Sequence, residues 1–494
     1  MLNFGPRPHF YPKYTMRTAI WWIRYDLRLH DNETLLRAIA HGERVLCVYC
    51  IDPAHYRQLK LGFRKTGILR TQFLKESLED LERSLKTIGG ALHLVHESPE
   101  TAIPRLAREV DADAVYVQEE IGTEERQMEV RVEERLRAHR VDLERTWGRT
   151  LYHLEDAPFA PEDAPETAKA LRNQLQKRAA IRELLPTPTS ITCPELAYTD
   201  FPSWSAIGFT DAELDEVTYP AYPGGETAAL DRLDYYTFGT RLIERYGYTR
   251  NQSLGPDYSS KFSAYLSNGC LSPRRAYKAI KEYEQLQGRN RSTWKLGFEL
   301  MWREYFQYQG LKHGRRMFFI GGTKNKEAEW TTDRVAFGRW CAGHTGIPFV
   351  DAHMRELLQT GFMSNRGRVN TASFFTRDLQ IDWRWGAAWF ESRLLDYDVA
   401  SNWLNWNTQA LHLYYTNPVH QGMKYDESGA YVHAWLPELR DVPAPLVQAV
   451  FTLDADEQQR YGVRLEEHYP AAIVRPDKWN RAIGRIRKAA EKVA

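Results

Sequence analysis

The sequence predicts two domains of different class: an α/β domain with a five-stranded, parallel, Rossmann-like sheet, followed by an all-α C-terminal domain. Short apolar runs alternate with helix-like stretches over residues 19–150, and this alternation is typical of a parallel sheet covered on both faces. Strand signals disappear after Glu226, and apolar residues then recur with helical spacing to about Leu439. A chain of 494 residues is long enough for both domains.

Five apolar runs of strand length make up the predicted sheet. The helix predicted over Thr71–Ile88 has apolar residues three and four apart and ends in Gly89-Gly90, a helix C-cap signal. A charged helix is predicted over Glu124–Arg140. Neither GxGxxG nor GxxxxGK[ST] occurs here, so the usual reasons to expect a nucleotide on the sheet are missing. The five runs are Ala19–Tyr25, Arg44–Asp52, Ala91–Glu97, Ala114–Glu119 and Asp142–Gly148.

The regions around the sheet complete the predicted organisation. Residues 1–18 carry three prolines and no apolar core, which indicates a flexible arm rather than a secretory signal. Proline-rich residues 151–226 are predicted to be an interdomain connector that wraps over the surface without forming a core. Residues 227–440 form the helical domain, and residues 441–494 form a C-terminal extension. Within the helical domain, periodic stretches are Trp294–Gln309, His353–Thr360, Ala372–Leu379 and Ala387–Leu395.

The last twenty residues, Arg475–Ala494, predict an amphipathic basic helix. One interpretation is a terminal helix packed by Trp479, Ile483 and Ile486. The alternative is a contact for a nucleic acid, a membrane surface or a signalling partner. The sequence leaves both open.

Composition excludes several classes of protein. Lys and Arg number 66 against 65 Asp and Glu, so the net charge of +1 argues against a polybasic nucleic-acid binder as a whole. No run approaches the roughly 20 apolar residues of a membrane helix. Aromatic residues reach 13%, which indicates aromatic chemistry or stacking.

Five scattered cysteines predict no disulfide framework. Cys47 and Cys50 form a CxxC inside an apolar strand-like run, and residues three apart on a strand point to opposite faces. A packing role is therefore favoured over a redox or zinc site. A reducing compartment, taken as the cytoplasm, follows.

Two short sequence segments in the helical domain contain candidate ligand-binding residues. In the first, Ser259, Ser260 and Ser263 surround Lys261 just before a helical run, and hydroxyls with free N–H groups at a helix start suit an anion. Ordinary helix capping is the alternative. In the second, Glu299 and Trp302 are neighbours on one helix face, either as a pocket wall or as a helix edge.

An ion pair is predicted between helices of the same domain. Arg368 is expected to pair with Asp396 or Asp398. Burying such an ion pair inside an apolar bundle costs desolvation free energy, which is offset if the pair binds a ligand. A ligand with imide-like donors and acceptors would justify it.

Together these strings resemble the photolyase/cryptochrome family, most closely its cryptochrome DASH branch, over residues 18–440. Three strings resemble signatures of the whole family: Trp22–Asn32, Thr345–Leu357 and Tyr431–Leu439. Four more resemble the DASH branch: Thr249–Asn251, Leu254–Ser263, Gly361–Arg368 and Ala400–Trp403.

The resemblance implies that the helical domain binds FAD in a bent form, away from the sheet. Basic and hydroxyl groups are expected at the ribose and pyrophosphate: Tyr246, Arg250, Ser259, Ser260, Lys261 and Ser263. Amide and paired charged groups are expected at the isoalloxazine ring: Arg368, Asp396, Asp398 and Asn402, with Asn402 at the position that faces flavin N5. The protein would tune and orient the flavin, which does the redox work.

The resemblance also implies an electron relay and a lesion site. Trp406, Trp383 and Trp330 match the family's relay from flavin to solvent, with core packing as the alternative for each. The chemistry would be that of a deoxyribodipyrimidine photo-lyase, which repairs a flipped-out cyclobutane pyrimidine dimer, with a preference for single-stranded DNA. Trp302 would stack on the dimer, while Glu299 and Asn365 would hydrogen-bond its base edges.

The chain departs from the family at the lesion pocket. Thr408 stands where many photolyases have a second stacking Trp and DASH proteins a Tyr, and Val369 stands where Met or Gln is usual. Losing one stacking face would weaken lesion binding by ~1–3 kcal/mol. The segment Asn407–Gln421 is shorter than the usual DASH loop, and Tyr414 or Tyr415 is a candidate to compensate.

An antenna pigment, methenyltetrahydrofolate, is the last implication of the resemblance. Glu120 matches the family's acidic folate contact, with a surface-loop glutamate as the alternative. Two other functions stay open beside repair. One is a blue-light photoreceptor with little repair, favoured by the altered pocket and the basic tail; the other is a flavin-bearing nucleic-acid binding protein.

Overall fold

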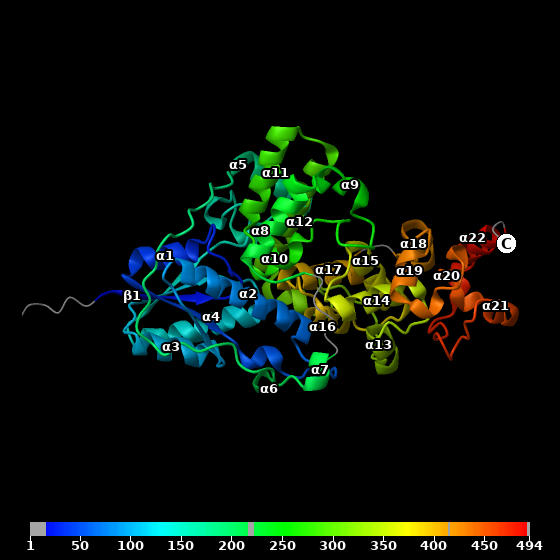
Figure 1. Ribbon diagram of the computed structural model, residues 1–494, viewed down its shortest axis with the longest axis horizontal. Helices are drawn as coiled ribbons and strands as arrows, with labels where there is room; N and C mark the ends of the chain where they lie inside the picture. The colour runs from blue at the N-terminus through cyan, green and yellow to red at the C-terminus, as the bar shows by residue number, and fades with distance from the viewer. Residues whose placement is uncertain (1–15, 216–221, 413–414, 492–494) are drawn as a thin grey trace, which may run out of the picture.

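The computed structural model describes residues 16–215, 222–412 and 415–491, and it confirms the predicted sheet (Figure 1). All five strands are parallel, in the order β3-β2-β1-β4-β5. Their bounds are β1 Thr18–Ile23, β2 Arg44–Cys50, β3 Leu92–Val95, β4 Ala114–Gln118 and β5 Asp142–Thr146. Thr18, assigned to the flexible arm above, is buried as the first residue of β1, and most of that arm lies outside the described residues.

The central strand β1 is buried on both faces because helices cover both sides of the sheet. Trp21 joins the core that contains Phe73 of α2, whereas Trp22 joins the opposite core, formed with α3 and α4. Cys47 and Cys50 divide between the same two cores, which confirms the packing interpretation of the CxxC. The helices of this domain are α1 Glu33–His41, α2 Ile68–Thr87, α3 Pro99–Glu109 and α4 Thr123–Arg137.

The connector contributes to the core, so the prediction that it only wraps the surface is wrong in this respect. Its helix α5, Ala168–Arg178, buries Leu171 and Leu175 completely, and Phe209 is buried after the short helix α6, Trp204–Ile207. These side chains join the core that also holds Trp21. A proline-rich segment can therefore follow the surface and still place widely spaced apolar residues inward.

The second domain is helical, as predicted, and has two cores. Helices α8–α12 share the core on one sheet face, whereas a separate core is built mainly from residues of α13–α20 and α22. No helix among the described residues is long and apolar enough to cross a membrane. The helices up to residue 440 are α8 Glu226–Asp234, α9 Tyr246–Thr249, α10 Phe262–Asn268, α11 Pro273–Gln287, α12 Arg291–His313, α13 Arg334–Cys341, α14 Pro348–Thr360, α15 Asn365–Ser373, α16 Trp383–Arg393, α17 Val399–Leu411, α18 Pro418–Tyr425 and α19 Ala430–Trp435.

The C-terminal extension packs against the helical domain at the end of the molecule farthest from the sheet (Figure 1). Its helices are α20 Ala444–Val447, α21 Ala455–Arg460 and α22 Asn480–Ala490. Trp479 and Ile486 are each 1% exposed, and the Trp479 indole donates a hydrogen bond to Tyr415 Oη at 2.6 Å. This confirms the packed-helix interpretation of the basic tail.

The two domains are joined through buried polar groups that follow β5. The Arg149 guanidinium donates to Glu120 at 2.5 Å and to Asp398 at 2.7 Å, and all three side chains are nearly inaccessible. One turn of chain further, the Glu304 carboxylate of α12 accepts from the backbone N–H groups of Leu151 and Tyr152 at 2.8 and 3.1 Å. Helices α12 and α17 are thereby fixed to the end of the sheet domain.

The buried Glu304 predicts a pH dependence of stability. Burial raises the pKa of this carboxyl to about 7 from an ordinary value near 4.5. The folded chain therefore holds a proton that the unfolded chain has lost, so stability falls as pH rises from about 4.5 to 7. The expected contribution is about 3 kcal/mol. Urea unfolding at pH 5 and pH 7.5 should show a smaller fall for Glu304→Gln than for the wild type. An unchanged fall would contradict this assignment.

Candidate functional site

A buried lysine of the helical domain has no ion-pair partner in the part of the chain that the structure describes. Lys261, at the start of α10, is 3% exposed, and its ammonium lies over the rings of Tyr258 and Phe362 at 3.4 and 4.1 Å. Within the described residues it makes no ion pair with a carboxylate. Burial lowers its pKa to about 7. A buried charge left in this way is costly to the protein alone, and an anionic ligand would supply its counter-ion.

The predicted ion pair forms next to this lysine, and the structure selects Asp396. Arg368 Nη2 lies 2.8 Å from Asp396 Oδ2, and Arg368 Nε donates to the carbonyl of Met363 at 2.9 Å. The Phe362 ring contacts both Lys261 and Arg368, since the Arg368 guanidinium lies 5.5 Å from the ring centroid. The other Asp396 oxygen, Oδ1, is buried without a partner among the described residues.

Asp398 has a different role in the structure. Its carboxylate accepts hydrogen bonds from Arg149, from Gln307 at 2.8 Å and from the backbone N–H of Ser401 at 2.8 Å. Burial alone would raise its pKa, but the Arg149 guanidinium lowers the pKa of Asp398 to about 2. Both oxygens are thus bound by the protein, and the predicted contact of Asp398 with the flavin ring stays a prediction.

The remaining predicted FAD contacts differ in how deeply they are buried. Asn402 on α17 is buried, and its amide donates to the carbonyl of Ala387 at 3.0 Å, which fixes its orientation. Tyr246 on α9 is buried beside Arg250. Among the three serines, Ser260 is buried, Ser259 is half-buried and Ser263 is exposed.

Two residues near Lys261 were not singled out from the sequence. Glu356 of α14 is buried and accepts a 2.5 Å hydrogen bond from Tyr431; burial raises its pKa to about 7, and the nearby Lys261 charge opposes that rise. It lies within the family string that ends at Leu357, which was the available signal. Arg232 shapes the loop before α10 by pairing with Asp257 at 2.9 Å and bonding backbone carbonyls there.

The buried polar groups of this cluster fit a bound FAD. Tyr236 Oη and Tyr258 Oη are buried without hydrogen-bond partners among the described residues, as is Asp396 Oδ1. Such groups carry a desolvation cost unless a ligand satisfies them. Lys261 provides positive charge for a pyrophosphate, and the Arg368–Asp396 pair offers the donors and acceptors that a flavin ring requires. The predicted residues and the orphaned atoms therefore point to one ligand.

The three tryptophans of the predicted relay lie on or beside α16 and α17. Trp406 is 3% exposed and Trp383 is fully buried, whereas Trp330 is half-buried, so the residue predicted to be outermost is the most exposed of the three. Trp330 is placed beside the start of α16 because Thr331 pairs with the strand-like residues just before Trp383. The Trp406 ring rests against Gly386, one turn after Trp383 on α16.

The predicted lesion residues lie on exposed surfaces. Trp302 on α12 is 39% exposed, and Asn365 at the start of α15 is also exposed. Glu299 forms an ion pair with Arg250, which links a predicted lesion contact on α12 to a predicted FAD contact. The two groups were predicted to bind separate ligands, and the structure brings them together.

The residues of the altered pocket wall lie on α15, on α17 and in the segment after α17. Thr408 is half-buried and donates its hydroxyl to the carbonyl of Leu404 in its own helix. Val369 is half-buried on α15. Tyr415 donates to Asp378 at 3.1 Å and accepts from Trp479, so it is held by the C-terminal extension. Tyr414 lies outside the described residues.

Glu120 is buried at the domain junction, so the surface-loop alternative is wrong. It is 2% exposed, it pairs with Arg149, and burial raises its pKa to about 7. Gln118 donates to its other oxygen at 3.4 Å. Its carboxylate is thus engaged by the protein, and a folate contact stays a prediction.

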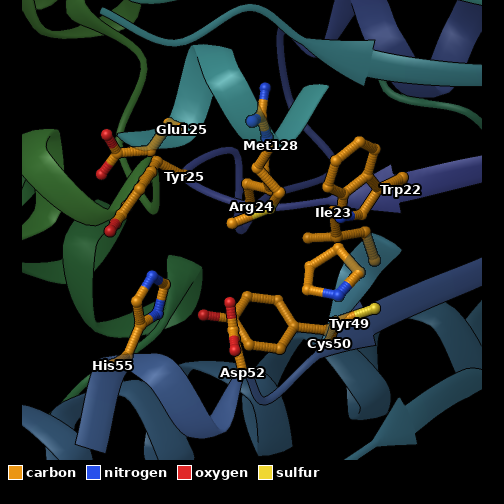
Figure 2. Close-up of a pocket in the computed structure, with 11 residues that line it drawn as sticks. Trp22, Ile23, Arg24, Tyr25, Tyr49, Cys50, Asp52, His55, Glu125 and Met128 are labelled. Carbon is orange, nitrogen blue, oxygen red and sulfur yellow. The ribbon is translucent and has the colours of Figure 1, made fainter. Parts of the chain in front are cut away.

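A separate cavity of about 30 Å³ lies at the carboxyl ends of β1 and β2. Figure 2 shows Tyr25, Tyr49, Asp52, His55 and Glu125 around it. Ligands of open α/β sheets commonly bind at this edge, but this volume holds only about two water molecules. This cavity is therefore too small for a pigment.

Comparison with known proteins agrees with this architecture. Residues 19–190 match the family described as DNA photolyase, and residues 296–488 match the FAD binding domain of DNA photolyase. A relative from Gloeobacter violaceus, named cryptochrome DASH, is 43% identical over 93% of each chain. Another cryptochrome DASH, from Danio rerio, is 39% identical over 94% of this chain and 92% of its own.

Solved structures extend the agreement to three dimensions. The crystal structure of a Synechocystis cryptochrome has a TM-score of 0.89 at 40% identity and covers 96% of this chain and 99% of that one. A bacterial class III photolyase from Agrobacterium tumefaciens has a TM-score of 0.79 at 27% identity, covering 97% and 100%. A parallel sheet joined to a helical domain with a cation-lined site defines a flavoprotein of photolyase type. The chain belongs to the photolyase/cryptochrome family, and it resembles the family's cryptochrome DASH members.

The contact between Gly386 and Trp406 generates a stability prediction. A Cβ at Gly386 would lie 2.3 Å from the Trp406 ring, so Gly386→Ala should displace that ring and destabilise the protein by about 1–3 kcal/mol. Gly338→Ala on α13 is the matched control, because a Cβ there meets nothing within 4 Å. This control should gain up to about 1 kcal/mol from helix propensity. Urea unfolding measures both; equal effects would refute the close packing.

Proposed function

We propose that this protein is a blue-light-driven lyase for cyclobutane pyrimidine dimers in single-stranded DNA. The observation that supports the proposal is the ion pair between Glu299 and Arg250, because it joins a residue expected at the lesion, one turn from the exposed indole of Trp302, to a residue expected at the FAD. When bound, FAD supplies the light absorption and the electron. Trp302 stacks on the dimer, and Glu299 and Asn365 hydrogen-bond its base edges.

The protein's own groups have distinct parts in this proposal. Lys261 neutralises the pyrophosphate, Tyr246 and the three serines contact the ribose and phosphate side, and Arg368 with Asp396 and Asn402 orients the ring. Trp406, Trp383 and Trp330 carry electrons between the buried site and the surface. A methenyltetrahydrofolate antenna near Glu120 remains a proposal, as does a cytoplasmic location, which five free cysteine thiols support.

A blue-light photoreceptor is the second candidate function. The observation that favours it is Thr408, whose hydroxyl is turned into its own helix and offers no stacking face. Signalling through the C-terminal extension would use the outward basic residues of α22, since its apolar side is buried.

Repair is tested by the loss of thymine dimers from a single-stranded oligonucleotide under blue light with reduced, FAD-loaded protein. Glu299→Gln should lower repair roughly 10- to 100-fold because it removes a charge-assisted hydrogen bond. Glu213→Gln is the matched control: that glutamate is similarly exposed and is also paired with an arginine, in the connector. Wild-type protein that retains FAD and repairs nothing in light would overturn the proposed activity.

The relay is tested by photoreduction of the bound flavin, followed by absorption. Trp406→Phe should slow photoreduction at least tenfold at unchanged FAD content, because a benzene ring is a much poorer electron donor than an indole. Trp389→Phe is the control, since Trp389 is a buried indole of the same core that contacts Phe63. A photoreduction rate in Trp406→Phe equal to that of the wild type would refute this relay.

The photoreceptor is tested separately: light-dependent oligomerisation without repair would favour it.

A further inference from the structure

Helix α12 carries an aromatic residue at every fourth position. Trp294, Phe298, Trp302 and Phe306 form what we term the aromatic ladder, and successive ring centroids lie 5.1, 6.2 and 6.3 Å apart. Residues four apart share one helix face. Twelve residues of helix rise about 18 Å, so the ladder is a continuous strip of that length.

The aromatic ladder is not part of a hydrophobic core. Trp294 is 43% exposed and Trp302 is 39% exposed. Within the described residues, Phe306 is the one member that packs against a hydrophobic cluster. The core-facing side of α12 is supplied by other residues, including Leu296 and Leu300. The three outer rings therefore expose a contiguous apolar strip on an otherwise ordinary protein surface.

Positive charge accompanies the aromatic ladder. The Arg172 guanidinium of α5 lies 5.0 Å from the Phe298 ring, and the Lys295 ammonium lies 4.5 Å from it. Glu299, the carboxylate on this face, is paired with Lys295 at 3.0 Å and with Arg250. Arg172 has no carboxylate partner within ion-pair distance in the part of the chain described. Exposed rings interleaved with cations are the arrangement that binds single-stranded nucleic acids.

We propose that the aromatic ladder is a stacking track for the bases that flank the lesion on one side of a single-stranded DNA. The inference rests on the proposed function, because Trp302 is both the residue proposed to stack on the lesion and a member of the aromatic ladder. A strip of about 18 Å matches roughly five stacked bases at 3.4 Å each. Trp294 is the far end of the track, eight residues and about 12 Å from Trp302.

The track is tested in the dark by the binding of a fluorescent, undamaged oligothymidylate to FAD-loaded protein. Trp294→Ala should weaken binding about tenfold, within the 5- to 150-fold range for one base–aromatic stack. Trp294→Phe keeps a ring and should bind nearly as the wild type does. Phe319→Ala is the control, because Phe319 is 48% exposed but lies beyond the end of α12. Equal binding by Trp294→Ala and wild type would overturn the track.

A short substrate separates this inference from the proposed function. A dinucleotide thymine dimer can occupy the lesion site at Trp302 but cannot reach Trp294. Trp294→Ala should therefore lower kcat/KM about tenfold for a dimer in a long oligonucleotide and leave that for the dinucleotide unchanged. Equal losses on both substrates would overturn the track. Wild-type protein that repairs neither substrate would refute the lyase activity, while the dark binding assay would still decide the track.

Discussion

The buried guanidinium of Arg149 is the contact on which the arrangement of the two domains depends. It follows β5 and binds Glu120 of the sheet domain and Asp398 of the helical domain at once. Asp398 also caps α17, the helix that carries Asn402 and Trp406. Removal of one partner from such a buried group leaves an uncompensated charge, at a cost of about 3–5 kcal/mol. The position of α17 relative to the sheet is thus set electrostatically.

The charged groups of the helical domain fall into two kinds. Some are fully paired within the protein and have a structural role, whereas others lack a partner among the described residues and are candidates to bind a ligand. Asp398 has both oxygens occupied by Arg149, Gln307 and a backbone N–H group. Lys261 lies over aromatic rings and forms no ion pair within the described residues, and one oxygen of Asp396 has no partner there. Because unpaired buried polar groups are costly, the second set marks where the protein alone is incomplete. That set coincides with the predicted FAD contacts.

The high aromatic content serves two different environments. Trp383 and Trp406 lie within a core and are packed on all sides, Trp406 by Phe375 and Phe390 among others. Trp294 and Trp302 are exposed on one face of α12 instead. Tryptophan is thus packed inside a core in one place and exposed on a helix face in another, and these two settings suit the two proposed roles, an electron relay and a surface for bases.

The sequence by itself determined the classes of structure: short apolar runs predicted the five strands, and apolar residues three and four apart predicted several of the longer helices, because local spacing dictates which face is apolar. It also identified Lys261, Arg368 and Asn402 through strings that are local in the chain. Only the tertiary structure decided which charged residues form ion pairs. These pairs are Arg368 with Asp396, Arg149 with Asp398, and Arg250 with Glu299. Glu356 and the core contribution of the connector emerged in the same way. These contacts join residues far apart in sequence, so chain folding, not local propensity, selects each partner.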